Sequence, residues 1–234
     1  LFNNNDELII KNNKIVWNNL RKLIHEIAIT EEELCKIEMK KRNKLENTIK
    51  LRFANNISED SILSTPILDR NLEKYINIGD TGWQERYYKE LFDIDINDSR
   101  RQEICINYLE GLEWNFKYYI NGCPDWAWHY KYKYPPLLQD LYKYIPQFDT
   151  VFIESNNNKP VDPLVQLAYV LPRNSLYLLP DKLYRKLIET KPDWYRLDFK
   201  ILWAYCRYLW EGHVDLPHIN IKELELLIQN VKNS

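Results

Sequence analysis

The sequence predicts a mainly α-helical fold, an irregular multi-helix domain with long aromatic-rich loops. Apolar residues recur at intervals of three and four along several segments, which is the spacing of one helix face. Capping and stop residues bound these segments, and segments with the two-residue period of strands are few and short. A chain of 234 residues that is 45% hydrophobic is long enough to bury a core.

The N-terminal residues predict a pair of helices. Residues 15–27 carry apolar side chains at helical spacing, and a second apolar series follows from Leu34 to Ile49. Between them, Thr30 followed by Glu33 matches a capping box, in which both side chains satisfy amides at a helix start. The pair is therefore expected to break near Thr30.

The sequence pattern predicts that the chain has three parts. Residues 1–54 hold the helix pair, and residues 55–81 lose the helical period and are rich in Asn, Ser and Asp, which predicts a linker or loop. Residues 82–234 form the main helical domain. The chain begins with Leu1 instead of methionine, so we expect it to be part of a longer protein.

Five helices are expected in the main domain, from their apolar stripes and their caps. The first begins near Trp83, and the second runs from Asp98 to Ile120 before Asn121, Gly122 and Pro124 stop it. The other three have recognisable starts. These starts are Asp162-Pro163, Asp181, and Asn220 with Glu223.

Composition excludes several kinds of protein. A net charge of −2 gives no overall attraction for nucleic acid, and five glycines leave no glycine-rich phosphate loop. No apolar run reaches the ~18–20 residues of a membrane helix. The four cysteines lack a C-x-x-C pair, which favours reduced thiols over a disulfide framework or a zinc site. We therefore expect an intracellular protein, cytoplasmic or nuclear, with no membrane partner.

No catalytic residue and no metal site is predicted in this segment. The run Asp93, Asp95 and Asp98 has oxygen ligands for a divalent cation, but acidic residues are also ordinary at a helix start. The four histidines lack ligand spacing. Arg100 and Arg101 open the long helix, where pairing with nearby acids is expected.

One segment, residues 123–136, carries the candidate binding residues. Its tryptophans and tyrosines alternate with His129 and two lysines, so an extended chain would present rings on one side and cations on the other. Such rings stack on bases and such lysines meet phosphates. Alternatively, the rings pack on neighbouring helices and only the lysines face water. The candidate RNA-binding residues are Trp126, Trp128, Lys131 and Lys133.

Five sequence blocks occur in order along the chain. They are G-W-Q-E-R-Y-Y-K-E-L-F from Gly82, Y-L-E-G-L-E-W from Tyr108, W-A-W-H-Y from Trp126, P-V-D-P-L-V-Q-L from Pro160, and Trp210 with Leu216-Pro217. Together they resemble the helical region that follows the nuclease domain in XRN-type 5′→3′ exoribonucleases. The chain departs from that family at Lys133, where a histidine is usual, and at Pro135, where an alanine is usual.

The resemblance implies a function. Members of this family degrade 5′-monophosphorylated RNA with Mg²⁺ ions held by an N-terminal nuclease domain, which would lie upstream of this segment and be its partner. The helical region closes the active-site pocket and stacks a tryptophan on single-stranded RNA. That tryptophan is Trp126 or Trp128, and the other is expected to anchor the turn in the core together with Trp114, Tyr118 and Tyr119. The alternative is a non-catalytic helical protein-interaction module.

Overall fold

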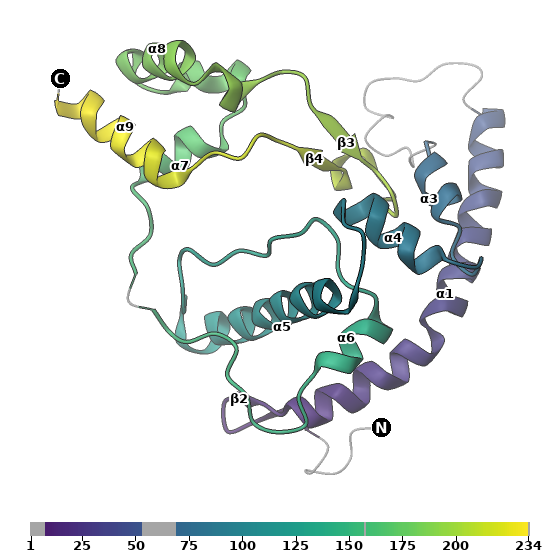
Figure 1. Ribbon diagram of the computed structural model, residues 1–234. Coiled ribbons are helices and arrows are strands. Elements are labelled where there is room, and N and C mark those ends of the chain that lie inside the picture. Colours follow the sequence, from purple (N-terminus) through teal and green to yellow (C-terminus); the bar gives the residue numbers. More distant parts are fainter. Residues whose placement is uncertain (1–7, 53–68, 157, 234) are drawn as a thin grey trace. The chain divides into compact units, whose positions relative to one another are not determined.

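The computed structural model describes residues 8–52, 69–156 and 158–233 and confirms the mainly α fold (Figure 1). The described chain forms two compact units. The first contains the residues up to 156 together with Trp203–Glu211, and the second contains residues 158–202 and 212–233. The expected division into 1–54, 55–81 and 82–234 stays a prediction.

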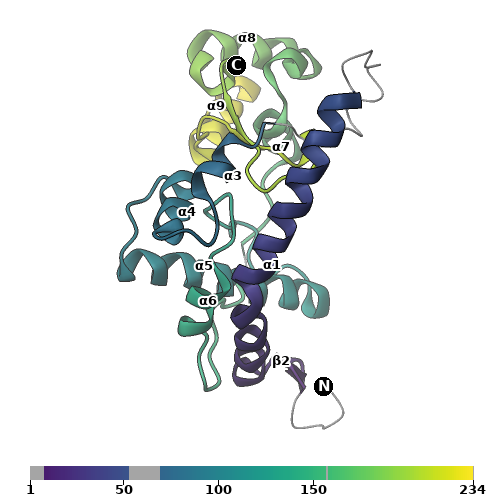
Figure 2. The ribbon, with the colours of Figure 1, turned by 90° about the vertical axis from the view of Figure 1, so that its right-hand side faces the viewer.

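The N-terminal helix pair is one continuous helix, α1 (Trp17–Arg52), as Figures 1 and 2 both show. The predicted break near Thr30 is wrong. The Thr30 hydroxyl donates to the Ile27 carbonyl at 3.0 Å, a bond that a helix interior tolerates, instead of capping a new helix. Residues 17–52 also contain no glycine or proline that would end the helix.

A short hairpin precedes α1. Its strands β1 (Ile10–Lys11) and β2 (Lys14–Ile15) pair antiparallel. Asn12 and Asn13 form the turn with φ of 51° and 57°, a left-handed conformation that asparagine tolerates better than most residues. The hairpin leads into buried Trp17, whose Nε1 donates to the Thr150 carbonyl at 2.8 Å.

Part of the expected linker is helical. Residues 55–68 lie outside the described residues, but Asn71–Ile76 form helix α3, which ends at left-handed Asn77. A buried ion network holds α3 to α1, because Glu73 accepts from Arg70 at 2.7 Å and from Arg42 at 2.8 Å. The network supplies stabilisation that the apolar period of this segment does not reveal.

The other helices of the first unit pack around buried residues. Helix α4 (Trp83–Phe92) buries the four residues that its stripe predicts, and α5 (Asp98–Asn121) ends at the predicted stop, where Gly122 has a φ of 84°. Helix α6 (Leu138–Tyr144) was not predicted, and it contacts α1. Its first amide, on Leu138, donates to both Glu31 oxygens at 2.9 and 3.1 Å. One core joins Trp17, Cys105, Leu109, Leu141 and Ile145.

The second unit contains the three C-terminal helices, each starting where the caps predict. They are α7 (Pro163–Val170), α8 (Asp181–Thr190) and α9 (Ile221–Asn233). The Asp162 carboxylate accepts from the Leu164 amide at 2.9 Å, and the side-chain Oδ1 of Asn220 accepts from the Glu223 amide at 3.2 Å. The remaining helices and strands are short. They are η3 (Arg173–Leu178), η4 (Pro192–Tyr195), β3 (Lys200–Leu202) paired with β4 (His213–Asp215), and, in the first unit, η5 (Leu209–Glu211).

Candidate nucleic-acid interface

Residues 122–137, all within the described part of the chain, form neither helix nor strand and run as an extended segment from α5 to α6. The predicted alternation is present from position 128 onward. Trp128, Tyr130, Tyr132 and Tyr134 are half-buried or buried, and the residues between them are exposed. Successive side chains of an extended chain point to opposite sides, so this segment packs its rings inward and turns its cations outward.

Trp128 is held against α5. Its ring stacks on that of Trp114 with centroids 5.9 Å apart and an angle of 24° between the planes. Its Nε1 donates to a Glu110 carboxylate oxygen at 3.4 Å. Gly111 leaves the space that the indole fills, because a Cβ at this position would lie 2.7 Å from Cη2 of Trp128. Trp128 therefore anchors the segment.

Trp114 extends this contact into a three-ring stack. Its other neighbour is Tyr118, with centroids 5.3 Å apart and planes 9° from parallel. Trp114 Nε1 also donates to the Asp125 carbonyl at 2.8 Å, which fixes the start of the turn. The expectation that Tyr118 and Tyr119 lie in the core is wrong, since Tyr119 is 84% exposed and Tyr118 is exposed as well.

Trp126 is more exposed than half-buried Trp128, with 52% of its surface open to solvent. The turn that carries it is closed by the Asp125 carboxylate, which accepts from the Ala127 amide at 2.7 Å. The sequence left open which indole anchors and which contacts a ligand. The geometry gives Trp128 the anchoring position and leaves the Trp126 ring on the surface.

Lys131 and Lys133 are both exposed. The backbone at Lys131 is fixed, because its amide donates to the Oδ1 of buried Asn107 at 2.9 Å. A pocket of about 420 Å³ beside Lys131 is also lined by Glu103 and Glu110, so its charge is mixed.

The tyrosines of the segment are structural. Burial raises the pKa of Tyr130 and of Tyr134 far above the usual range, so both phenols stay neutral. The Tyr130 hydroxyl donates to the Tyr134 carbonyl at 2.8 Å, and the Tyr134 hydroxyl donates to the Ala204 carbonyl at 3.1 Å. These bonds hold the segment in shape.

The acidic run at the start of α5 takes ordinary structural positions. Asp95 accepts from Lys89 at 2.8 Å, Asp93 ends α4 in a left-handed conformation, and Asp98 lies 3.4 Å from Arg101. Arg100 pairs with Glu103 at 3.2 Å, as local pairing predicts. Among the described residues, no three His, Cys, Asp or Glu side chains gather closely enough to hold a metal ion.

The described cysteines and histidines take structural positions where their surroundings are known. All four cysteines are free thiols. Burial raises the pKa of Cys105 to about 12 and raises that of Cys35, which keeps both protonated near neutral pH. His25 packs against Tyr142 with ring centroids 4.6 Å apart and a tilt of 45°, and exposed His129 lies 3.4 Å from the Ala127 carbonyl.

Of the α5 residues that support the segment, the sequence predicted Trp114 as an anchor but missed Asn107, Glu110 and Gly111. Asn107, Glu110, Gly111 and Trp114 contact it by hydrogen bonds, by stacking or by leaving space. Their spacing of three, four and seven residues places them on one helix face, and this pattern could have identified them.

The fold and its surface define a class of protein: a mainly helical domain that presents an aromatic turn anchored on α5. Within the described ranges, no helix combines the length and the hydropathy that crossing a membrane requires. The family comparison is specific. The chain belongs to the Xrn1 helical domain family, whose model matches residues 3–234.

Curated relatives agree with this membership. A 5′-3′ exoribonuclease 2 of Gallus gallus is 35% identical over 165 residues, covering 68% of this chain and 17% of that protein. One of Arabidopsis thaliana is 36% identical over 157 residues, covering 64% and 15%. A 5′-3′ exoribonuclease 2 homolog of Caenorhabditis elegans is 32% identical over 160 residues, covering 67% and 16%. The chain thus spans less than a fifth of the length of these relatives.

Proposed function

We propose that this chain is the part of a 5′→3′ exoribonuclease that closes the active-site pocket and contacts single-stranded RNA by base stacking. The substrate is RNA with a 5′-monophosphate. Family membership and the names of the relatives support the enzyme class. The observation that carries the RNA contact is the exposed indole of Trp126, on a turn that Trp128 and Trp114 fix to α5.

Stacking is the contact that this surface favours. An aromatic face accepts any base and contributes ~1–3 kcal/mol per base, so it suits an enzyme that moves along RNA without reading its sequence. The anchored turn lowers the entropy that binding would cost, because Asp125 and Trp128 already hold the backbone in place. Trp126 is therefore the stacking residue in this proposal.

The exposed lysines of the segment complete the contact. Lys131 and Lys133 face outward on the same extended segment that carries Trp126. They would meet the phosphates between stacked nucleotides, and this local charge is needed because the net charge of the chain is −2. The contribution of each lysine should weaken as salt rises.

Hydrolysis belongs to another part of the protein in this proposal. A nuclease domain of the same polypeptide would hold Mg²⁺ with its own carboxylates, and the metal would activate water and stabilise the leaving oxygen. The residues of this chain shape and close the pocket. The nuclease domain and single-stranded RNA are accordingly the proposed partners.

The test uses the complete protein with Mg²⁺ and single-stranded RNA carrying either a 5′-phosphate or a 5′-hydroxyl. We expect degradation of the 5′-phosphate RNA only, and about tenfold slower degradation by Trp126→Ala, which corresponds to ~1.4 kcal/mol of lost stacking. Tyr75→Ala, which removes an exposed ring elsewhere in the first unit, is the matched control and should keep the full rate.

Two results would change the proposal. If Trp126→Ala degrades RNA at the full rate, the stacking contact is wrong even though the enzyme class stands. If the complete protein degrades neither RNA, a non-catalytic helical protein-interaction module becomes the better description.

A further inference from the structure

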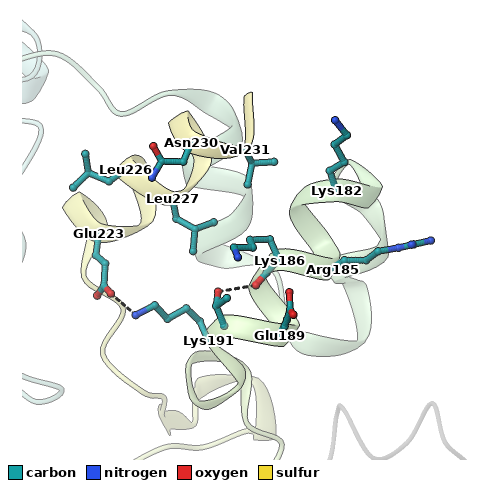
Figure 3. A pocket seen from close by; sticks show the side chains of 11 residues that line it. Lys182, Arg185, Lys186, Glu189, Lys191, Glu223, Leu226, Leu227, Asn230 and Val231 are labelled. Carbon is teal, nitrogen blue, oxygen red and sulfur yellow. Dashed lines mark hydrogen bonds and ion pairs between the residues drawn. The ribbon is translucent and has the colours of Figure 1, made fainter. Parts of the chain in front are cut away.

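The second unit contains an open groove between α8 and α9, with a volume of about 870 Å³ (Figure 3). This volume lies within the ~300–1,000 Å³ of ligand pockets. Both helices use their other faces for the core of the unit, where Leu183, Leu187, Leu224 and Ile228 are almost fully buried. The groove is therefore a second surface of these helices.

Helix α9 supplies an apolar wall. Leu226, Leu227 and Val231 line the groove. Leu227 and Val231 are four residues apart and share one side of the helix, where they also pack against the edge of the core, and Leu226 lies beside them. In Figure 3, Leu227 and Val231 point into the space between the helices. Leu226 is 61% exposed, although the core of the unit is already closed by other residues. An exposed leucine beside two half-buried apolar residues is the kind of surface that a partner covers.

Helix α8 supplies a basic wall. Lys182, Arg185 and Lys186 line the groove at intervals of three and four residues, and none of them makes an ion pair with any described residue. Lys186 extends toward α9 in Figure 3, whereas the side chains of Lys182 and Arg185 extend from α8 away from α9. At one end, Lys191 pairs with Glu223.

The charges of the groove do not balance. Its lining has four cations and two carboxylates, so 4 − 2 leaves a net charge of +2. The Lys191–Glu223 pair accounts for one charge of each sign, and Glu189 is the remaining carboxylate. A ligand that combines apolar groups with negative charge would therefore complement this groove.

We propose that this groove is the docking site for an acidic amphipathic helix of a partner protein. The lining residues span nine positions on each helix, about 13 Å at 1.5 Å per residue, which is room for two to three turns. Apolar side chains at helical spacing on the partner contact Leu226, Leu227 and Val231. Asp or Glu on the flank of the partner meet Lys182, Arg185 and Lys186.

Nucleic acid fits this groove less well than a helix. Phosphates would meet the three cations but would leave the apolar wall in water. Binding of single strands depends on rings that stack on bases, and none of the eleven lining residues is aromatic. The chemistry of the groove therefore favours a peptide.

The test uses the complete protein and a labelled synthetic helix of about 18 residues, long enough to hold helical structure, with leucines at helical spacing and glutamates on one flank. Binding is followed by fluorescence anisotropy. We expect Lys186→Glu and Leu226→Gln each to weaken binding about tenfold. Lys222→Glu, an exposed change on α9 outside the groove, should alter it less than about twofold.

Two further measurements make the test decisive. A peptide with lysine in place of each glutamate should bind at least about tenfold more weakly. Circular dichroism and thermal melting of each variant show that a loss of binding is not a loss of fold. Equal binding of the acidic peptide by wild type, Lys186→Glu and Leu226→Gln would overturn the proposal, and so would binding of a single-stranded oligouridylate that depends on Lys186 but not on Leu226.

Discussion

The indole of Trp128 stacks on that of Trp114 at 5.9 Å between centroids, with Gly111 providing the space on α5. This contact ties an extended segment with neither helix nor strand to α5. The segment therefore keeps its shape through side chains, and the exposed Trp126 turn depends on residues that never meet a ligand themselves.

Replacing Trp128 should therefore cost stability, whereas replacing Trp126 should not. Trp128→Ala removes a half-buried ring and its stack, and we expect a loss of about 1–2 kcal/mol in the free energy of unfolding. Trp126→Ala should change it by less than about 0.5 kcal/mol, as surface changes do. Urea unfolding of both variants makes the comparison, and equal effects would mean that the two indoles do not have the separate roles assigned to them.

Gly111→Ala tests the space that Trp128 occupies. The added Cβ would lie 2.7 Å from Cη2 of Trp128, and overpacking of this kind costs about 1–3 kcal/mol. Alanine recovers up to about 1 kcal/mol through its higher helix propensity. We expect a net loss of about 1 kcal/mol together with a change in tryptophan fluorescence. Gly122→Ala is the control, because it strains a backbone with a φ of 84° but touches nothing within 4 Å; a more stable Gly111→Ala protein would contradict the packing described above.

Glu73→Gln should be strongly destabilising. The side chain is fully buried, and it binds Arg42, Arg70 and the backbone amide of Tyr205. Removing its charge takes the carboxylate away from Arg42 and leaves almost fully buried Arg70 with the longer 3.5 Å pair to Glu46, which we expect to cost about 3 kcal/mol.

The control for Glu73 is an exposed ion pair. Glu38→Gln breaks the 3.7 Å pair with Lys41 and should cost less than about 0.5 kcal/mol. Thermal or urea unfolding measures both variants. Similar small losses would show that the network around Glu73 is not what holds α3 to α1.

The cap of α7 predicts a pH dependence. The Leu164 amide, and then Lys232, lower the pKa of Asp162 below its usual value of 3.8. A carboxyl group whose folded pKa is lowered stabilises the fold fully above the unfolded pKa, and this contribution disappears as pH falls through the folded pKa.

Asp162→Asn isolates that contribution. Asparagine keeps the capping oxygen but does not titrate, so the difference in stability between wild type and variant should shrink as pH falls from about 5 toward 2. Unfolding curves across this range give the measurement. A difference that stays constant with pH would rule out Asp162 as the titrating group.

The sequence predicted most of the helices because their causes are local. Asp162-Pro163 and Asn220 start helices through hydrogen bonds within a few residues, and Gly122 ends α5 through its left-handed backbone. The wrong and missed helix predictions had causes outside the local sequence pattern. Thr30 was predicted to start a helix because the same hydroxyl can cap or bond backward, and only the surrounding helix decides which. Helix α3 was missed because its stabilising partners lie on α1.

The candidate interface likewise has one feature that the sequence predicted and one that only the tertiary structure shows. The alternation of rings and cations in residues 123–136 was visible in the sequence, since it needs only the period of an extended chain. The sequence could not distinguish the role of Trp126 from that of Trp128. Both are tryptophans, and because they are two residues apart, an extended chain would point them to the same side. Tertiary structure separates them: Gly111 and Trp114 leave room for one indole on α5, and the other remains on the surface.

The sequence by itself determined the mainly helical class, the caps and ends of most helices, and the resemblance that family comparison confirms. Tertiary structure alone decided the unbroken α1, the ion network around Glu73, the anchoring of Trp128 and the groove between α8 and α9. The physical reason is the distance along the chain over which each interaction acts. Helix propensity and capping act over one or two turns, whereas burial, stacking and ion pairing join residues that only the folded chain brings together.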